Sequence, residues 1–266
     1  MSAADAGMPA WAGQEGYDVR FQWGPAAAPA LAGGICVVVD VLRFTTAVEA
    51  AAARGVTVYP YRGRDATAAA FADRVGAALA GHRDPAGPSL SPLSMAALVP
   101  GTSLVLPSPN GSTCAILASE AGARVVAGCL RNAAAVGAWA GSAGSSGSAG
   151  SGGGPVTVIA CGEKWPDGSL RPSLEDLLGA GAILAHVAGR PSPEARAAIA
   201  AFRDAEHDLP DVLRQCASGR ELSEKGRDAD IGYAAQLNVS TAVPVLESGA
   251  FLTPPGARGG PPSPAR

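Results

Sequence analysis

Acidic and basic side chains directly follow apolar runs in this sequence, as a site at the edge of a β-sheet requires. Asp40 and Arg43 come after Ile35 to Val39, a run without a charged residue. Such a run is typical of a strand covered on both faces in a parallel sheet, and helical spacing begins at Thr45. Asp40 and Arg43 are therefore predicted to lie between an inner strand and a helix, where α/β proteins bind ligands. Their side chains offer a metal ligand beside an anion clamp.

A second polar stretch, PSPNGSTCA, follows a short strand predicted at Leu104 to Leu106. It places Asn110, Gly111 and Ser112 between the strand end and a helix, where backbone N–H groups and a hydroxyl could hold an anion. An ordinary helix N-cap would give the same pattern, and the local sequence does not separate the two.

A third stretch begins after the strand predicted at Val156 to Ala160 and places Glu163 at the same sheet edge as Asp40. Ser173 is predicted to cap the next helix, with Glu175 and Asp176 in its first turn. Acidic residues there stabilise a helix through its dipole, which is their structural interpretation. Their position beside Glu163 also makes them candidates for the site.

Two further polar positions follow from the same pattern. Asn132 is predicted to cap a helix over Ala133 to Ala140, and Arg220 and Asp230 stand out in a polar cluster near the C-terminus.

Composition restricts the classes of function. The chain of 266 residues carries a formal net charge of −3, and its basic residues are scattered, so nucleic acid is not an expected partner. Its five cysteines are widely spaced, which is typical of reduced thiols. No signal peptide or membrane span is recognisable, and we expect a cytoplasmic protein.

The alternation of strands and helices predicts an α/β fold, with three α/β/α layers around a mostly parallel sheet. The sequence further predicts a strand at Val56 to Tyr61, which follows the strand at Ile35 to Val39 and its helix, then a helix at Arg64 to Ala80. It predicts a last strand at Ala242 to Leu246. One domain is expected over 17–252, with a flexible N-terminus at 1–16, a flexible Gly/Ser loop at 141–154 and a disordered tail at 253–266. Alanine-rich helices could form a subunit interface in a homo-oligomer.

Several of these stretches together resemble one known family. The segments VVVDVLRFTTAVEAAAARG, SPNGSTCA, CLRNAAAV, ACGEKW, SLEDLLGAGAI, SGRELSEKGRDADI and VPVL occur in this order between about Val37 and Leu246. They are similar to the 2-phosphosulfolactate phosphatase (ComB-like) family of coenzyme M biosynthesis. The D-V-L-R-x-T-T element is the most specific of them.

The resemblance implies a Mg²⁺-dependent phosphatase that hydrolyses a small anionic phosphomonoester, 2-phospho-3-sulfolactate, to 3-sulfolactate and phosphate. The residues that match the family are Asp40, Arg43, Asn110, Gly111, Asn132, Glu163, Glu175, Asp176 and Asp230. We accordingly expect metal ligands among Asp40, Glu163, Glu175 and Asp176, with Asp40, Arg43, Glu163 and Asp176 in catalysis. Substrate contacts are expected from Asn110, Gly111, Ser112, Asn132 and Arg220.

The sequence departs from the family pattern at two places. It reads Gly81-His82-Arg83 where Gly-Glu-Arg is expected, and Ser89-Leu90-Ser91-Pro92 where Gly-Asn-Ser-Pro is expected. A carboxylate and an amide are lost, which leaves a diverged, non-catalytic binder of a small phosphorylated or sulfonated metabolite as the alternative. Metal-activated water is the expected attacking group, because a phosphoaspartyl enzyme has a second aspartate two residues after the first and this position is Leu42 here. Asp40 as a covalent nucleophile stays open.

Overall fold

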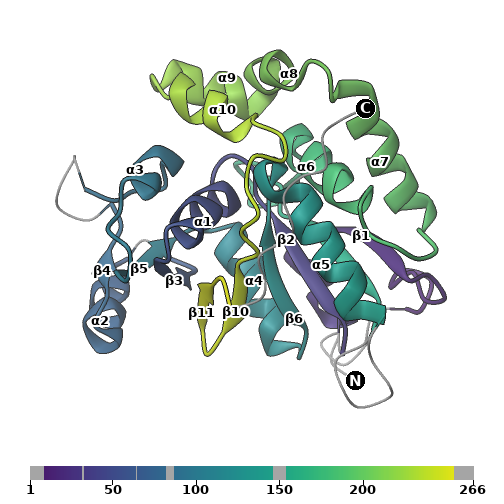
Figure 1. Ribbon diagram of the computed structural model, residues 1–266, viewed down its shortest axis with the longest axis horizontal. Coiled ribbons are helices and arrows are strands. Elements are labelled where there is room, and N and C mark those ends of the chain that lie inside the picture. The colour runs from purple at the N-terminus through teal and green to yellow at the C-terminus, as the bar shows by residue number, and fades with distance from the viewer. Residues whose placement is uncertain (1–8, 32, 64, 82–86, 146–153, 255–266) are drawn as a thin grey trace.

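The protein folds around one large twisted sheet with helices on both faces (Figure 1). The computed structural model describes residues 9–31, 33–63, 65–81, 87–145 and 154–254. The sheet contains β1 (Val19–Trp23), β2 (Ile35–Val39), β3 (Thr57–Tyr61), β4 (Ala78–Leu79), β5 (Ser103–Pro107), β6 (Arg124–Gly128), β7 (Val156–Ala160), β10 (Val245–Glu247) and β11 (Ala250–Leu252). Their order across the sheet is β1-β7-β2-β6-β10-β11-β3-β5-β4.

The sheet is mostly parallel, as predicted, but an antiparallel hairpin joins its two halves. The strands β1, β7, β2 and β6 form one parallel half, and β3, β5 and β4 form the other. Between them, β10 pairs with β6 through Val245 and Val126, and β11 pairs with β3 through Phe251 and Val58. The strand predicted at Ala242 to Leu246 is thus the first arm of a hairpin that the sequence analysis did not foresee.

Helices cover the sheet in two layers, which confirms the three-layer fold. The helices are α1 (Phe44–Ala53), α2 (Ala66–Val75), α3 (Pro92–Ala96), α4 (Gly111–Glu120), α5 (Ala133–Ser145), α6 (Leu174–Leu184), α7 (Pro193–Ala205), α8 (Leu209–Gln215), α9 (Ala217–Glu224) and α10 (Asp228–Ala234), with 3₁₀ turns η1 (Pro25–Leu31) and η2 (Leu130–Asn132). The helix predicted over Arg64 to Ala80 is shorter than expected because Gly76 ends it in the left-handed conformation, at φ 65°.

The central strand β2 divides the core into two layers. Its residues Ile35, Val37 and Val39 face the layer of α5, α6 and α7, whereas Cys36 and Val38 face the layer of α1 and α4. Every residue of β2 is at most 1% exposed, as its apolar sequence predicts. The turn after β2 is therefore held by a rigid, fully buried strand.

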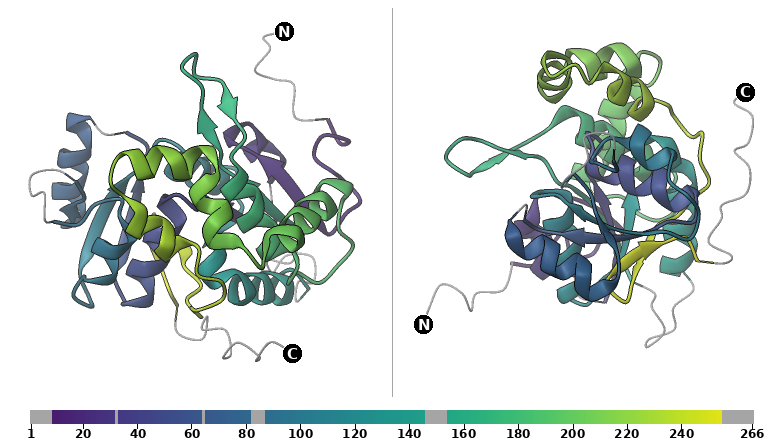
Figure 2. Two further views of the ribbon diagram at one scale, coloured as in Figure 1. Left: turned by 90° about the horizontal axis from the view of Figure 1, so that it is seen from above. Right: turned by 90° about the vertical axis from the view of Figure 1, so that its left-hand side faces the viewer.

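Two smaller units stand above the sheet. The helices α8, α9 and α10, which we call the cap, lie over the edge at which β2 ends (Figure 1). A two-stranded ribbon of β8 (Glu163–Lys164) and β9 (Leu170–Arg171) projects from the body (Figure 2). Helix α9 was not foreseen, because its polar sequence was interpreted only as a cluster of candidate groups.

Two segments predicted to be flexible are partly ordered. In the N-terminal segment, the amide of Gln14 donates to the carbonyl of Phe21 at 2.6 Å and accepts from its N–H at 3.1 Å. Gln14 thereby pairs with the edge strand β1 as a neighbouring strand would. Helix α5 continues through Ser145, so the first residues of the predicted 141–154 loop are helical. Residues 146–153 and 255–266, and with them most of the predicted loop and tail, lie outside the described chain.

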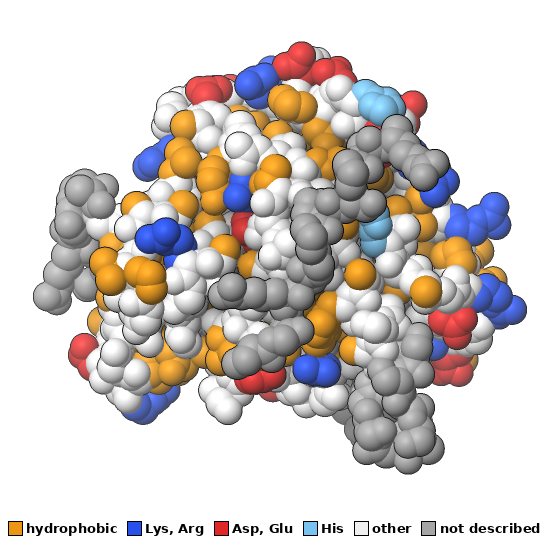
Figure 3. All heavy atoms as spheres, viewed as in Figure 1, with side chains coloured by type: hydrophobic (Ala, Val, Ile, Leu, Met, Phe, Trp, Pro, Cys, Tyr) orange, Lys and Arg blue, Asp and Glu red, His pale blue; other side chains and the backbone are white. Residues whose placement is uncertain are grey.

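The surface in the view of Figure 3 carries basic and acidic side chains that are interspersed. In the part of the chain that the structure covers, no helix combines the length and apolar character needed to cross a bilayer.

Candidate active site

Asp40 lies where β2 ends, and the first turns of two helices hold its carboxylate. Oδ1 accepts a hydrogen bond from the backbone N–H of Phe44 at 3.1 Å, and Oδ2 accepts one from Gly111 at 3.0 Å. The side chain is buried, and these bonds fix its orientation. Asp40 thus connects the turn before α1 to the turn before α4.

Gly111 is required by this arrangement. A Cβ at this position would lie 2.2 Å from Cδ1 of Phe44 and 2.8 Å from Oδ2 of Asp40. Both distances are shorter than van der Waals contact, so only glycine lets the N-terminus of α4 reach the carboxylate. Gly111 was expected to contact the substrate; in the structure its backbone N–H binds Asp40, and Gly111 is not among the residues that line the cavity described below.

Glu163 and Asn110 meet on the wall of a cavity that also includes Asp40. The amide of Asn110 donates to Oε2 of Glu163 at 2.8 Å. The cavity has a volume of about 470 Å³, and Arg43 also lines it. Four residues predicted from three separate stretches are thus brought together, which is the spatial coincidence that a phosphatase site requires.

Arg43 is held by the cap. Its Nη1 donates to Oδ2 of Asp230 at 2.5 Å, and the second oxygen of Asp230 accepts from the hydroxyl of Ser91. Asp230 is buried in α10, whereas Arg43 reaches the cavity. Asp230, one of the residues that match the family, therefore forms an ion pair with Arg43, the predicted anion clamp.

Asp176 lies behind the cavity instead of on its wall. Its Oδ1 accepts from the N–H of Val41 at 2.8 Å, and its Oδ2 accepts from the N–H of Gly162 at 2.9 Å. These two residues belong to the turns that carry Asp40 and Glu163. Asp176 thus binds the two turns together, which differs from the expectation that it contacts the metal and takes part directly in catalysis.

Glu175 is also buried away from the cavity lining. Its Oε2 accepts a hydrogen bond from the thiol of Cys216 at 3.4 Å, which connects α6 to the start of α9. Glu175 is close enough to Asp40 and Asp176 to influence both electrostatically, but it does not line the wall where a metal was expected.

Burial and mutual repulsion raise the pKa values of this acidic group. Burial raises the pKa of Asp40 to about 7, and Glu163 and Glu175 add to the shift against the opposing effect of the Phe44 and Gly111 N–H groups. Burial likewise raises the pKa of Glu163, and burial with the charges of Glu175 and Asp40 raises that of Asp176. The carboxylates are therefore short of compensating positive charge.

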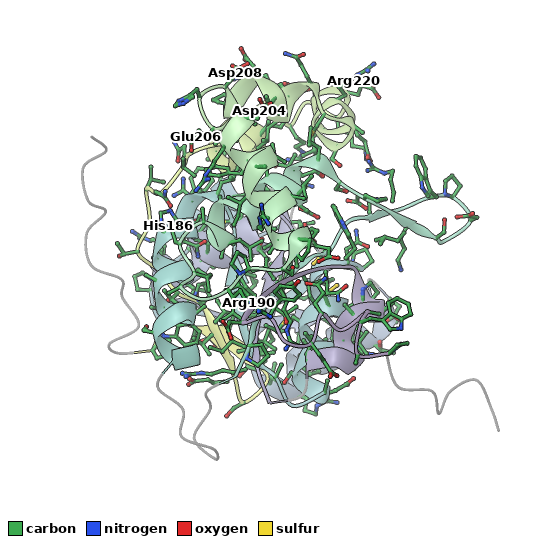
Figure 4. All side chains as sticks on the ribbon, turned by 90° about the vertical axis from the view of Figure 1, so that its right-hand side faces the viewer. His186, Arg190, Asp204, Glu206, Asp208 and Arg220 are labelled. Atoms are coloured by element: carbon green, nitrogen blue, oxygen red, sulfur yellow. The ribbon has the colours of Figure 1, made fainter. Side chains whose placement is uncertain are left out.

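Three predicted substrate contacts lie elsewhere. Ser112 is fully buried, and its hydroxyl accepts from the N–H of Tyr61 and donates to the carbonyl of Leu106. Asn132 is fully buried and accepts from the N–H of Cys129. Arg220 stands on the outer side of the cap (Figure 4). These residues do not line the cavity because the first two satisfy backbone groups and the third faces solvent.

The cap contributes groups to the cavity that were not among the predicted site residues. Ser218, Glu221, Leu222 and Lys225 line it from α9 and the residue after it. They follow the spacing i, i+3, i+4 and i+7, which places them on one helical face, with Arg220 outside it. Helical periodicity in this polar segment was the signal that could have identified them. Arg62, which follows β3, was missed as well.

The donors on the cavity wall suit Mg²⁺. Carboxylate oxygens are the ligands this ion prefers, and Mg²⁺ commonly uses one or two carboxylates together with waters and substrate phosphate. Asp40 and Glu163 provide such a pair, and burial, the main cause of their raised pKa values, disfavours their charge in the absence of a cation. Across the described ranges, no group of three or more His, Cys, Asp or Glu side chains forms a metal site, so further ligands would come from water or substrate.

Comparison with known proteins gives a consistent result. Residues 25–249 match the family described as 2-phosphosulpholactate phosphatase. The chain is 30% identical over 220 residues to "2-phosphosulfolactate phosphatase" of Methanothermobacter thermautotrophicus, covering 81% of this chain and 88% of that protein. It is 38% identical over 88 residues to "Probable 2-phosphosulfolactate phosphatase" of Gloeobacter violaceus, covering 33% of this chain and 36% of that protein.

Proposed function

Because the chain belongs to the 2-phosphosulfolactate phosphatase family, we propose that it hydrolyses 2-phospho-3-sulfolactate to 3-sulfolactate and phosphate with Mg²⁺ as cofactor. The observation that carries the proposal is the cavity in which Asp40, Glu163 and Arg43 meet. Phosphoryl transfer depends mainly on positioning the reacting groups and stabilising their charge. Two carboxylates that can hold a cation, next to a guanidinium that can bind a phosphoryl group, meet both requirements.

Asp40 and Glu163 are the residues proposed to hold the metal. When bound, Mg²⁺ would neutralise phosphoryl oxygens and lower the pKa of a coordinated water. The Phe44 and Gly111 N–H groups hold Asp40, and the amide of Asn110 holds Glu163, so both carboxylates are oriented before the ion arrives.

Arg43 is proposed to bind the phosphoryl group. Its guanidinium reaches the cavity and is held from behind by Asp230, which fixes its direction. A preorganised cation stabilises charge that develops on the phosphoryl oxygens without reorganising during the reaction. We propose water as the attacking group, because Leu42 stands two residues after Asp40, where a phosphoaspartyl enzyme carries its second aspartate.

The test is release of inorganic phosphate from 2-phospho-3-sulfolactate by the purified protein, with Mg²⁺ and with a chelator. We expect release that depends on Mg²⁺ and is lost in Asp40→Asn. Leu90 lines the cavity at the position where the family pattern has an asparagine. This loss of an amide favours the second candidate function, a diverged, non-catalytic binder of a small phosphorylated or sulfonated metabolite. Binding of the ester without phosphate release would establish the non-catalytic binder and refute the phosphatase.

A further inference from the structure

A second, smaller cavity adjoins the first. It has a volume of about 230 Å³, and Arg43 and Leu90 line both cavities. Its other walls come from β4, the end of β5 and the segment before α10, so it lies beside the cap and away from Asp40 and Glu163. The two cavities therefore meet at the guanidinium proposed to bind the phosphoryl group.

The charged groups of the smaller cavity favour an anion. Among the described residues that line it, Arg43 and Arg227 are basic and Asp65 is acidic. Oδ1 of Asp65 accepts from both the N–H and the hydroxyl of Thr67, so this carboxylate is committed to capping α2. Arg43 is paired with Asp230 and Asp65 caps α2, so Arg227 carries the charge that an anion in this cavity would meet.

Arg227 differs from the other cations near the site. In the larger cavity, Arg62 pairs with Glu120 at 2.8 Å and Lys225 pairs with Glu221 at 2.5 Å. Among the residues that the structure describes, the side chain of Arg227 has no hydrogen-bond or ion-pair partner. Its guanidinium is therefore available to a ligand at no cost of breaking an existing pair.

We propose that the smaller cavity binds one of the two acidic groups of the substrate that are not hydrolysed, the sulfonate or the carboxylate, and that Arg227 determines the preference for esters that carry such a group. This inference rests on the proposed function, since it takes the phosphoryl group to lie in the larger cavity beside Arg43. A compact ester with acid groups on neighbouring carbons would then have one anion on each side of Arg43. Leu79 and Leu106 form an apolar part of the wall, while Arg227 itself is exposed.

The experiment compares Arg227→Gln with Arg220→Gln in the full chain. Arg220 lies in the same cap at its outer side (Figure 4), is exposed and is not among the residues that line either cavity, so its substitution removes the same charge without touching the site. Steady-state kinetics are measured with 2-phospho-3-sulfolactate and with ethyl phosphate, which lacks a second acid. Binding of 3-sulfolactate is measured separately by calorimetry, and unfolding temperatures confirm that both variants are folded.

For Arg227→Gln we expect KM for 2-phospho-3-sulfolactate to rise about tenfold, which corresponds to about 1.4 kcal/mol. We expect kcat, and both constants for ethyl phosphate, to stay within about twofold, and 3-sulfolactate to bind about tenfold more weakly. Arg220→Gln should resemble the wild type. An unchanged KM for the sulfonated ester, or an equal rise for both esters, would overturn the inference while the phosphatase stands. Arg227-dependent binding of 3-sulfolactate by a protein that releases no phosphate would support the anion site and refute the proposed function.

Discussion

The Arg43 guanidinium and the Asp230 carboxylate are 2.5 Å apart, although 187 residues separate them in the sequence. Asp230 is buried in α10 and also accepts a hydrogen bond from Ser91 at the start of α3. One carboxylate thus connects the turn after β2, the segment before α3 and the cap. The direction of the proposed phosphoryl-binding cation therefore depends on the docking of the cap.

Substitution of Asp230 tests this dependence. Asp230→Asn removes the charge that holds Arg43, so we expect kcat/KM for the phosphate ester to fall at least about tenfold, since hydrogen bonds to charged groups contribute about 1.5–3 kcal/mol. Asp228→Asn is the matched control, because Asp228 lies in the same first turn but is exposed and accepts from Ser223. Equal activity of the two variants would show that Asp230 does not position Arg43.

Asp40→Asn separates chemistry from folding. The raised pKa of Asp40 shows that its charge is unfavourable in the folded protein, and a neutral amide of the same shape removes that charge. The amide keeps only one of the two bonds from the Phe44 and Gly111 N–H groups, but Asp40 lines the cavity, where water can replace the lost bond, whereas Asp176 lies behind it. We expect phosphate release to fall below detection while the unfolding temperature changes by less than about 4 °C, roughly the shift that 1 kcal/mol produces in a domain of this size. A variant that fails to fold would instead identify Asp40 as a structural residue.

Asp176→Asn is expected to behave in the opposite way. Both oxygens of Asp176 accept backbone N–H groups, and an asparagine can accept only one of these bonds. The unpaired N–H costs about 1–3 kcal/mol, so thermal unfolding should occur several degrees below that of the wild type. Divalent-cation binding, measured by calorimetry, should be retained. Loss of cation binding at unchanged stability would make Asp176 a metal ligand.

Gly111→Ala tests the close approach of α4 to Asp40. The added methyl would overlap the ring of Phe44, which is itself fully buried and cannot move aside cheaply. We expect a loss of about 1–3 kcal/mol in the free energy of unfolding together with loss of phosphate release. Ser112, the next residue, offers the comparison: Ser112→Ala removes only a hydroxyl and should keep the phosphatase active. Wild-type activity in Gly111→Ala would contradict the tight packing around Asp40.

The sequence predicted the half of the site that follows directly from strand ends. Asp40, Asn110 and Glu163 come after apolar runs, and parallel strands bring their carboxyl ends to one edge, so their meeting could be inferred. Local pattern could not show how the carboxylates are used. Glu163 and Asp176 were both expected at the metal, although Glu163 follows a strand and Asp176 lies in the first turn of a helix. The fold places Glu163 on the cavity wall and Asp176 against the backbone.

The cap was harder to predict because its contacts are long-range. Its helices are short and polar, and their periodicity competes with the signal of a charged loop. The antiparallel hairpin of β10 and β11 was not predicted, although Ser248 and Gly249 form its two-residue turn and such a dipeptide is a turn signal. The local sequence does not show that the hairpin inserts between two parallel halves of a sheet. The positions of both features depend on tertiary packing. For the same reason the local sequence indicates Arg220 as a substrate contact, although its neighbours Glu221 and Lys225 line the cavity.

The acidic cluster predicts how stability depends on pH and Mg²⁺. The pKa of Asp40 is about 7 in the folded protein, above its ordinary value of 3.8, so between these pH values the folded state binds more protons than the unfolded state. Stability of the metal-free protein should therefore fall as pH rises from about 4 to 7. A bound cation offsets the repulsion, so Mg²⁺ should raise the unfolding temperature more at pH 7.5 than at pH 5. Calorimetric scans at both pH values, with and without Mg²⁺, check this prediction. Asp40→Asn is the control, because it lacks the carboxylate and should lose much of the effect. An equal rise in unfolding temperature at both pH values would contradict cation binding at Asp40.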